Sequence, residues 1–166
     1  MTSLPIYAPD ATEDETDPGL LVAPDNFLVQ RAPAGTAGAV VVSVPHFGIG
    51  SPRPYTADEF ATRLGHHLAF GFQDAYVPHL YGALHKHGAR LVATQLSRLF
   101  VDVNRPRDDF ERKGDHVHSR GGVIRTHSRR GTPIFTTPPT AHEAEERLEQ
   151  FYDPYYAALE NALGRG

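Results

Sequence analysis

The sequence predicts an α/β domain with a central mixed or mostly parallel sheet and helices on its faces. Two observations indicate this fold. Residues 39–44 form an uninterrupted, β-branched run, which is typical of a strand buried on both faces of a sheet. Residues 90–95 form a second apolar run, and the two helical segments between the strands predict a crossover connection. The expected core contains Val40, Val41, Val42, Leu64, Leu91 and Val92.

The length of 166 residues favours one domain, which we place at residues 26–166. Residues 1–25 are rich in Pro, Asp, Glu and Thr without hydrophobic periodicity, so they are expected to form a flexible acidic tail. This segment carries six of the 20 acidic residues and none of the 16 basic ones. The rest of the chain therefore has two more basic than acidic groups. That excess is too small to favour nucleic-acid binding.

The first half of the chain contains further local signals. A short strand is expected at residues 27–30, followed by a turn rich in Pro and Gly at residues 32–38. Thr56 and Glu59 have the spacing of a capping box, which predicts a helix over residues 56–70.

The second half follows from similar patterns. A helix is expected over residues 75–87, with Gly88 as its C-cap. Residues 98–103 read as a short strand and residues 105–120 as a long polar loop. A hairpin is expected with strands at residues 122–126 and 133–136 and its turn at residues 128–131. The last expected element is a helix over residues 140–163, which opens with a Thr140–Glu143 capping box and breaks or kinks at Pro154.

Composition excludes several kinds of protein. The chain has no cysteine, so any metal must be held by His, Asp or Glu. No apolar run approaches ~20 residues and no signal peptide is recognisable, so we expect a cytoplasmic protein without a membrane span. The sequence has no H-E-x-x-H zinc motif, no glycine-rich nucleotide loop and no G-x-S-x-G serine elbow.

His46 follows the strand at residues 39–44, at the sheet end where ligands collect in open α/β folds. It is a candidate metal ligand, and the alternative is a loop histidine that holds its own turn. Asp74 is either the N-cap of the second helix or a carboxylate ligand. His116 and His118 could chelate a metal from one strand face, or they lie in a solvated loop.

The segment from Arg98 to Arg105 reads R-L-F-V-D-V-N-R. Arg98, Asn104 and Arg105 could clamp a carboxylate, because a guanidinium matches its geometry. The two arginines are seven residues apart and would face opposite sides of a straight strand, so we predict a bend near residues 102–104. Asp102 is expected to fix an arginine by a charge-assisted bond. In the alternative interpretation, Arg105 is a surface residue paired with Asp108 or Asp109.

Four segments occur in an order that resembles the N-formylglutamate amidohydrolase family, which is related in fold to zinc carboxypeptidases and aspartoacylase-type deacylases. They are V-P-H-F-G at residues 44–48, Q-D-A-Y-V-P-H-L-Y at 73–81, S-R-L-F-V-D-V-N-R-P at 97–106 and F-Y-D-P-Y-Y-A-A-L at 151–159. The resemblance implies part of the zinc-carboxypeptidase-like fold and metal-dependent hydrolysis of the N-formyl amide of a small acidic amino acid.

By the same resemblance, His46 and Asp74 are expected to bind zinc, and Arg98, Asn104 and Arg105 to hold substrate carboxylates. Phe47 stands where the family usually has serine. The family continues to a D-x-H-S segment with a further metal ligand, so a truncated chain is expected. The alternative is a catalytically incomplete anion-binding or accessory module. A sheet without its second half would leave one edge uncovered, which favours a homo-oligomer.

Overall fold

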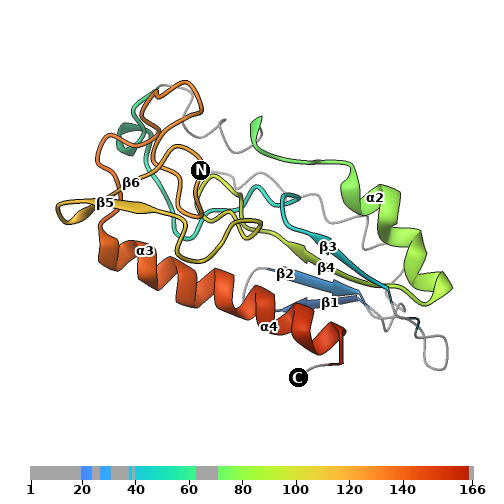
Figure 1. Cartoon of the computed structure of the whole chain (residues 1–166). Helices are drawn as coiled ribbons and strands as arrows, with labels where there is room; N and C mark the ends of the chain where they lie inside the picture. Colours follow the sequence, from blue (N-terminus) through green and yellow to red (C-terminus); the bar gives the residue numbers. More distant parts are fainter. Residues whose placement is uncertain (1–19, 24–26, 31–37, 39, 63–70, 165–166) are drawn as a thin grey trace.

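The structure, a computed structural model, describes residues 20–23, 27–30, 38, 40–62 and 71–164. Its centre is a sheet in which the described strands lie in the order β1 (Leu20–Ala23), β2 (Phe27–Gln30), β4 (Arg90–Thr94) and β3 (Val41–Val44). The β1–β2 and β2–β4 pairs are antiparallel and the β3–β4 pair is parallel, so the sheet is mixed (Figure 1). The predicted α/β class is therefore confirmed.

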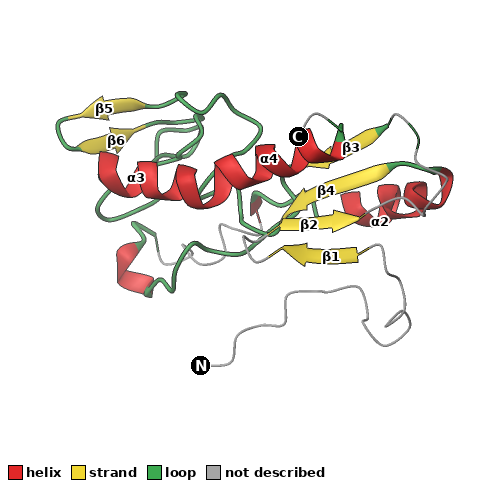
Figure 2. Ribbon diagram, turned by 90° about the horizontal axis from the view of Figure 1, so that it is seen from below, coloured by secondary structure: helices red, strands yellow, loops and turns green. Residues whose placement is uncertain are grey.

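Helices lie on both faces of the sheet (Figures 1 and 2). Side chains alternate across β4, and the two faces join different apolar clusters. Val92 belongs to the larger cluster, which also contains Tyr155 of α4 (Asp153–Ala162). Leu91 and Ala93 belong to a smaller cluster, against which Val77 of α2 (Val77–Tyr81) packs. Helices α2 and α4 therefore lie on opposite sides of one buried strand.

Strand β3 differs from the prediction. It is an edge strand among the described residues, Val40 is 59% exposed and Ser43 is exposed as well. The expectation of burial on both faces was therefore wrong for this strand, and Val40 does not belong to the core. Leu91 and Val92 are buried as expected, Val41 and Val42 are half-buried, and Leu64 lies outside the described residues.

The N-terminal half shows two further differences. Strand β1 lies at the end of the segment that was expected to be a flexible tail, so this prediction is wrong for residues 20–23. Residues 1–19 lie outside the described residues, and so does the predicted turn at residues 32–38 except Gly38. The capping box of Thr56 and Glu59 is present, but it opens only the 3₁₀ helix η1 (Ala57–Glu59). Phe60 is extended and bridges to Phe135, so a continuous helix over 56–70 is wrong.

The second predicted helix is built from α2 and the 3₁₀ helix η2 (Gly82–His87). Gly88 ends it with a φ of 90°, as expected for a glycine C-cap. Residues 98–103 contain no strand; Phe100 N donates to Ser97 O at 2.9 Å and closes a turn over residues 98–100. The segment is apolar because it lies inside the core, where Leu99 and Val101 are fully buried.

The predicted loop at residues 105–120 contains the hairpin of β5 (Glu111–Lys113) and β6 (His116–His118). Its turn uses Gly114, with a φ of 63°. The hairpin was missed because the side chains of β5 are exposed and polar, so no apolar alternation marks the strand. The next predicted hairpin is reduced to a His127–Pro133 bridge and a turn closed by Gly131 N and Ser128 O at 2.9 Å.

The C-terminal helix and its capping box are confirmed, but its irregular segment precedes the predicted position. It begins with the Thr140–Glu143 capping box at α3 (Ala141–Arg147) and continues to the end of α4. The irregularity does not lie at Pro154, which is the second residue of α4. It is the π-helical segment η3 (Leu148–Tyr152), which ends two residues before Pro154. Because proline cannot donate the backbone bond that continues a regular helix, the ladder rearranges just ahead of it. The long helix then runs along the sheet and the loops beyond it (Figure 2).

Candidate functional site

The candidate site lies where the parallel strands β3 and β4 end. The chain leaving β3 continues beside the chain leaving β4, since Gly50 N donates to Gln95 O and Ser97 N donates to Gly50 O, both at 2.9 Å. Gly48 permits this approach, because a Cβ there would lie 2.0 Å from Gln95 O. His46 is therefore held next to the segment that begins at Arg98.

His46 and Asp102 form the centre of the site. The imidazole Nε2 lies 2.7 Å from Asp102 Oδ1, and the side chains are 11% and 2% exposed, respectively. This contact joins residues 56 positions apart in the sequence, so His46 does more than hold its own turn. Sequence reasoning placed Asp102 correctly as a hydrogen-bonded carboxylate, but did not predict that His46 is a partner.

The other imidazole nitrogen faces two groups. Arg98 Nη1 donates to His46 Nδ1 at 3.0 Å, and Asp74 Oδ2 lies 3.4 Å from the same nitrogen. A guanidinium has no acceptor, so Nδ1 presents its lone pair to Arg98 and Nε2 carries the hydrogen that Asp102 accepts. Asp74 N also donates to His46 O at 2.8 Å, which ties the two loops together. The structure thus brings the predicted Arg98, His46 and Asp74 into one site.

Arg125 was missed by sequence reasoning. Its Nη2 donates to Asp102 Oδ2 at 2.7 Å, and only 5% of its side chain is exposed. The guanidinium carbons of Arg125 and Arg98 lie 5.2 Å and 5.8 Å from the ring centroid of Phe72. The available signal was an arginine directly after the apolar pair Val123–Ile124, because a charged residue in a buried run requires a partner.

The bend near Asp102 is present. Asn104 N donates to Asp102 Oδ1 at 3.1 Å and Arg105 N donates to Asp102 O at 3.0 Å, so the chain turns over its own carboxylate. Beyond the turn, the residues Asn104 and Arg105 are both exposed. Tyr152 Oη donates to Arg105 O at 2.8 Å and fixes the turn to the C-terminal helix.

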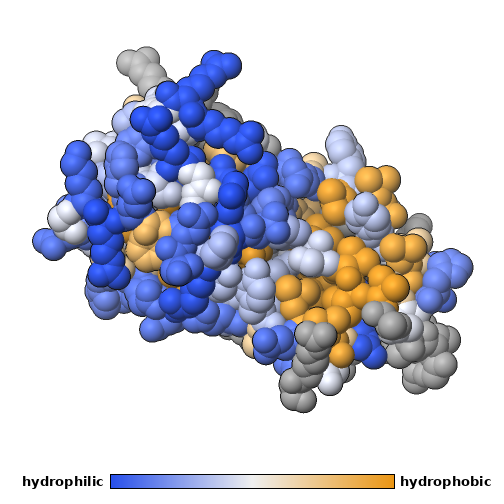
Figure 3. Space-filling model, in the orientation of Figure 1, coloured by the Kyte–Doolittle hydropathy of each residue, from blue (hydrophilic) through white to orange (hydrophobic). Residues whose placement is uncertain are grey.

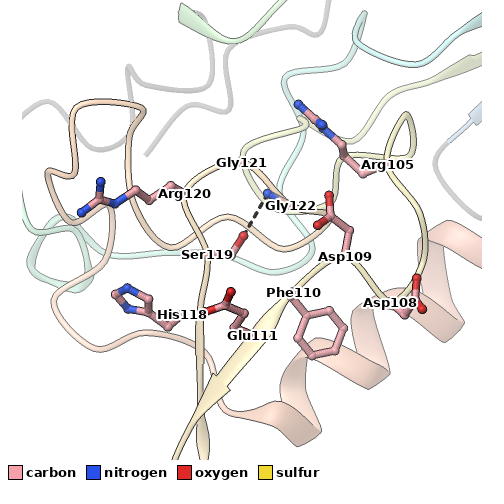
Figure 4. Close-up of a pocket in the computed structure, with 10 residues that line it drawn as sticks. All are labelled: Arg105, Asp108, Asp109, Phe110, Glu111, His118, Ser119, Arg120, Gly121 and Gly122. Carbon is pink, nitrogen blue, oxygen red and sulfur yellow. Dashed lines mark hydrogen bonds between the residues drawn. The ribbon is translucent and has the colours of Figure 1, made fainter.

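Arg105 lines a pocket of about 710 Å³ together with residues 108–111 and 118–122 (Figure 4). Arg105 and Asp109 lie on one side of this pocket and Arg120 lies on the other. His46 is not among the residues that line it. The prediction that Arg105 and His46 share one mouth therefore stays a prediction.

The charges of the site are strongly coupled. Burial raises the pKa of Asp102, but the hydrogen bonds from His46 and Arg125 outweigh burial and hold that pKa below its usual range. Burial also lowers the pKa of Arg125, and the bond to Asp102 opposes this shift. These opposed effects favour a buried carboxylate–guanidinium pair in its ionised form.

His116 and His118 lie on strand β6 and not in a loop. His118 packs against His127, with ring centroids 4.6 Å apart. Burial lowers the pKa of His127, and the nearby His118 and Arg120 lower it further. Among the described residues no three His, Cys, Asp or Glu side chains are grouped so that they could hold a metal.

The fold and site define an α/β protein whose polar site lies beyond the carboxyl ends of a parallel strand pair. This chain belongs to the N-formylglutamate amidohydrolase family, whose family model matches residues 38–166. The matched region contains every site residue described above. The resemblance found in the sequence is thereby confirmed.

Two relatives place the chain further. It is 33% identical over 94 residues to the N-formylglutamate deformylase of Pseudomonas putida, a match that covers 55% of this chain and 34% of that protein. It is also similar to the crystal structure of N-formylglutamate amidohydrolase from Ralstonia eutropha JMP134, with a TM-score of 0.66 and 28% identity. That match covers 85% of this chain and 53% of the solved one. The chain therefore spans about a third and about half of these two relatives.

A membrane-spanning helix would need a long apolar stretch, and no helix within the described part of the chain meets that requirement.

Proposed function

We propose that this protein is a metal-dependent amidohydrolase that removes the formyl group from the N-formyl amide of a small acidic amino acid. The observation that carries the proposal is the His46–Asp102 pair at 2.7 Å, within the region matched by the family. A histidine oriented by a buried carboxylate is typical of sites that bind a metal or move a proton.

The substrate would be held by arginines. Arg98 and Arg125 bring two guanidiniums to the His46–Asp102 pair. Burial lowers the pKa of Arg125, and Arg105 is close enough to lower it further. Guanidiniums gathered in a partly buried site favour an anionic ligand. We assign the substrate carboxylates to Arg98, Asn104 and Arg105, since Arg125 is already bound to Asp102.

Zinc is the proposed metal, and the residues present fit part of its site. His46 Nδ1 presents a lone pair toward Asp74 Oδ2 at 3.4 Å, and two electron-rich groups at this distance are stabilised by a cation between them. His46 and Asp74 would hold the ion, which when bound supplies carbonyl polarisation and an activated water. A catalytic zinc takes three protein ligands, and these two residues provide two.

The chain's own residues have distinct tasks in this proposal. Asp102 accepts the Nε2 hydrogen of His46 and so directs the Nδ1 lone pair outward. Arg98 occupies that lone pair in the structure, so metal binding would release its guanidinium toward a substrate carboxylate. In the overall reaction the water oxygen adds to the formyl carbon, the C–N bond breaks and the amine nitrogen takes up a proton. Formate and the free amino acid are the products.

A specific observation favours a second candidate. The described residues contain no group of three His, Cys, Asp or Glu side chains that could hold a metal. A chain with the arginines but without a complete metal site would bind acidic N-acyl amino acids without turnover. It would then be an anion-binding or accessory module.

Formate release from N-formylglutamate, measured with zinc added, tests both candidates. Release that is lost in His46→Ala supports the hydrolase. Calorimetric binding of N-formylglutamate without release supports the binding module. His142→Ala is the matched control, because His142 is 84% exposed in its side chain and lies on α3 away from Asp102. Neither release nor binding by the folded wild-type chain would contradict both proposals.

A homo-oligomer and a cytoplasmic location also remain proposals. The oligomer is supported by the position of β3 at the edge of the described sheet. It is also supported by exposed side chains on and beside α2, in the part of the molecule where Figure 3 shows a hydrophobic area. These side chains are Tyr76, Leu80, Tyr81 and Leu84. Sedimentation of the purified chain over a range of concentrations tests the oligomeric state.

A further inference from the structure

We infer that two tyrosines of the C-terminal helix, Tyr152 and Tyr156, are positioning residues. Their hydroxyls hold the turn at residues 103–105 in one conformation and thereby direct Arg105 toward an anionic ligand. Both act through the backbone of the turn. The ligand role of Arg105 rests on the proposed function, whereas the hold on the turn stands without it.

The two tyrosines bind the carbonyls on either side of Asn104. Tyr152 Oη donates to Arg105 O at 2.8 Å, and Tyr156 Oη donates to Val103 O at 3.0 Å. Burial raises the pKa of Tyr152, so its hydroxyl keeps its hydrogen at neutral pH. The two rings are stacked with their centroids 4.7 Å apart, so the hydroxyls approach the turn as one unit.

The turn is also held from its inner side. Asp102 Oδ1 accepts from Asn104 N at 3.1 Å, and Asp102 O accepts from Arg105 N at 3.0 Å. The amide hydrogens of the turn thus face Asp102, and its carbonyls face the helix. Arg105 itself is exposed, and among the described residues its guanidinium has no hydrogen-bond partner. The backbone of the turn therefore decides where this guanidinium points.

The irregular helical segment η3 places a third anchor beside the tyrosines. Arg107 donates to Glu145 at 2.6 Å and to the two carboxylate oxygens of Asp153 at 2.9 Å and 3.0 Å. In a regular α-helix the side chains of Glu145 and Asp153 would point about 80° apart around the axis. The additional residue of a π-helical turn between them reduces this angle to about 20°, so both reach one guanidinium. The π-helical segment therefore keeps one helix in contact with residues 103–107.

Loss of one hydroxyl should loosen the turn and leave the helix folded. Tyr152 is 7% exposed and belongs to the main apolar cluster, and phenylalanine retains its ring packing. The substitution leaves Arg105 O without its donor. The turn should then open about five to ten times more often, as expected for one hydrogen bond.

Amide hydrogen exchange of Asn104 and Arg105, followed by ¹H–¹⁵N NMR, measures the opening of the turn. Tyr152→Phe should accelerate exchange at both amides by about five- to tenfold. Tyr156→Phe should have the same effect from the Val103 side, because it removes the donor of the other carbonyl.

Tyr155→Phe is the matched control. Tyr155 is 1% exposed, and its hydroxyl lies 2.7 Å from Ser43 Oγ on strand β3. This substitution removes a buried hydroxyl from the same helix without touching the turn, so it reports the effect of a merely structural loss. Exchange at residues 104 and 105 should remain at the wild-type rate.

The ligand role is measured by calorimetry with N-formylglutamate. Tyr152→Phe should weaken binding by about five- to tenfold, and Tyr155→Phe should bind as the wild type does. In turnover, KM should rise by the same factor in Tyr152→Phe with kcat unchanged. A wild type that does not bind N-formylglutamate contradicts the proposed function, and the exchange rates then decide by themselves whether the tyrosines hold the turn.

Two results overturn the inference. One is a folded Tyr152→Phe in which exchange at Asn104 and Arg105 matches the wild type or changes no more than in Tyr155→Phe. The other is a Tyr152→Phe that binds N-formylglutamate with wild-type affinity. If Tyr152→Phe does not fold, Tyr156→Phe gives the same decision, since its side chain is 38% exposed and tolerates the loss of a hydroxyl.

Discussion

The Asp102 carboxylate and the Arg125 guanidinium lie 2.7 Å apart, with 2% and 5% of their side chains exposed. They are 23 residues apart in sequence, and the carboxylate also accepts from His46. The pair therefore joins three segments of the chain: the loop after β3, the turn at residues 102–105 and the segment that contains Arg125. Stability and function are coupled at this point.

Asp102→Ala is expected to lower the free energy of unfolding by about 3–5 kcal/mol, because it leaves the buried Arg125 without its partner. Urea denaturation measures this change. Asp153→Ala is the matched control: Asp153 also binds an arginine, Arg107, but both side chains are 39% exposed or more. Its loss should cost no more than about 1 kcal/mol. Equal effects of the two substitutions would contradict the structure.

Arg98→Met is expected to tighten zinc binding about tenfold, which corresponds to about 1.4 kcal/mol for the hydrogen bond that zinc no longer has to displace at His46 Nδ1. Competition with a chelating dye measures the affinity. Arg112→Met serves as control, because Arg112 is an exposed residue of β5 that lies over Phe110. Unchanged or weaker zinc binding in Arg98→Met would show that Arg98 and the metal do not compete.

Arg105→Lys is expected to weaken binding of a dicarboxylate ligand by about 1–3 kcal/mol, because lysine keeps the charge but lacks the bidentate fork. Isothermal titration calorimetry with N-formylglutamate measures the effect. Arg107→Lys is the control two residues away, where the arginine is held by Glu145 and Asp153. Equal affinity of the wild type and Arg105→Lys would assign Arg105 to the surface and remove it from the site.

Gly122→Ala should destabilise the protein by roughly 1–3 kcal/mol, as expected for overpacking, since a Cβ there would lie 1.8 Å from Asp109 O. The displacement would loosen the segment that carries Arg125. Gly121→Ala is the adjacent control, because a Cβ at Gly121 meets nothing within 4 Å. Thermal unfolding of both variants distinguishes them, and a Gly122→Ala variant as stable as Gly121→Ala would refute the close approach.

The start of α3 should respond to acid. Backbone hydrogen bonding from Thr140 holds the pKa of Glu143 below its usual range. Because the pKa of Glu143 is lower in the folded than in the unfolded protein, the ionised side chain stabilises the fold. This contribution is complete at a pH above the unfolded-state pKa, and it is lost as the pH falls through the folded-state pKa. Glu143→Gln keeps the capping geometry without titrating. Between pH 7 and strongly acidic pH, the wild type should therefore lose more thermal stability than Glu143→Gln, and parallel curves would contradict this assignment.

Local patterns predicted the elements whose hydrogen bonds are local. The Thr140–Glu143 capping box and the Gly88 C-cap each depend on residues within one or two helical turns. The same patterns misled where apolar residues served tertiary packing. Leu99 and Val101 are buried in a segment that forms no strand, and the hydrophobic period cannot distinguish such a segment from a strand.

The sequence by itself determined strands β2, β3 and β4, the second helical segment, the C-terminal helix, the candidate residues and the resemblance to the family. The candidate residues are His46, Asp74, Arg98, Asn104 and Arg105. Only the tertiary structure decided that β3 lies at the edge of the described sheet and that Arg125 meets Asp102. The physical reason is the range of the interactions. A cap or turn is encoded by neighbours along the chain, whereas a buried charge pair forms between residues that only folding brings together.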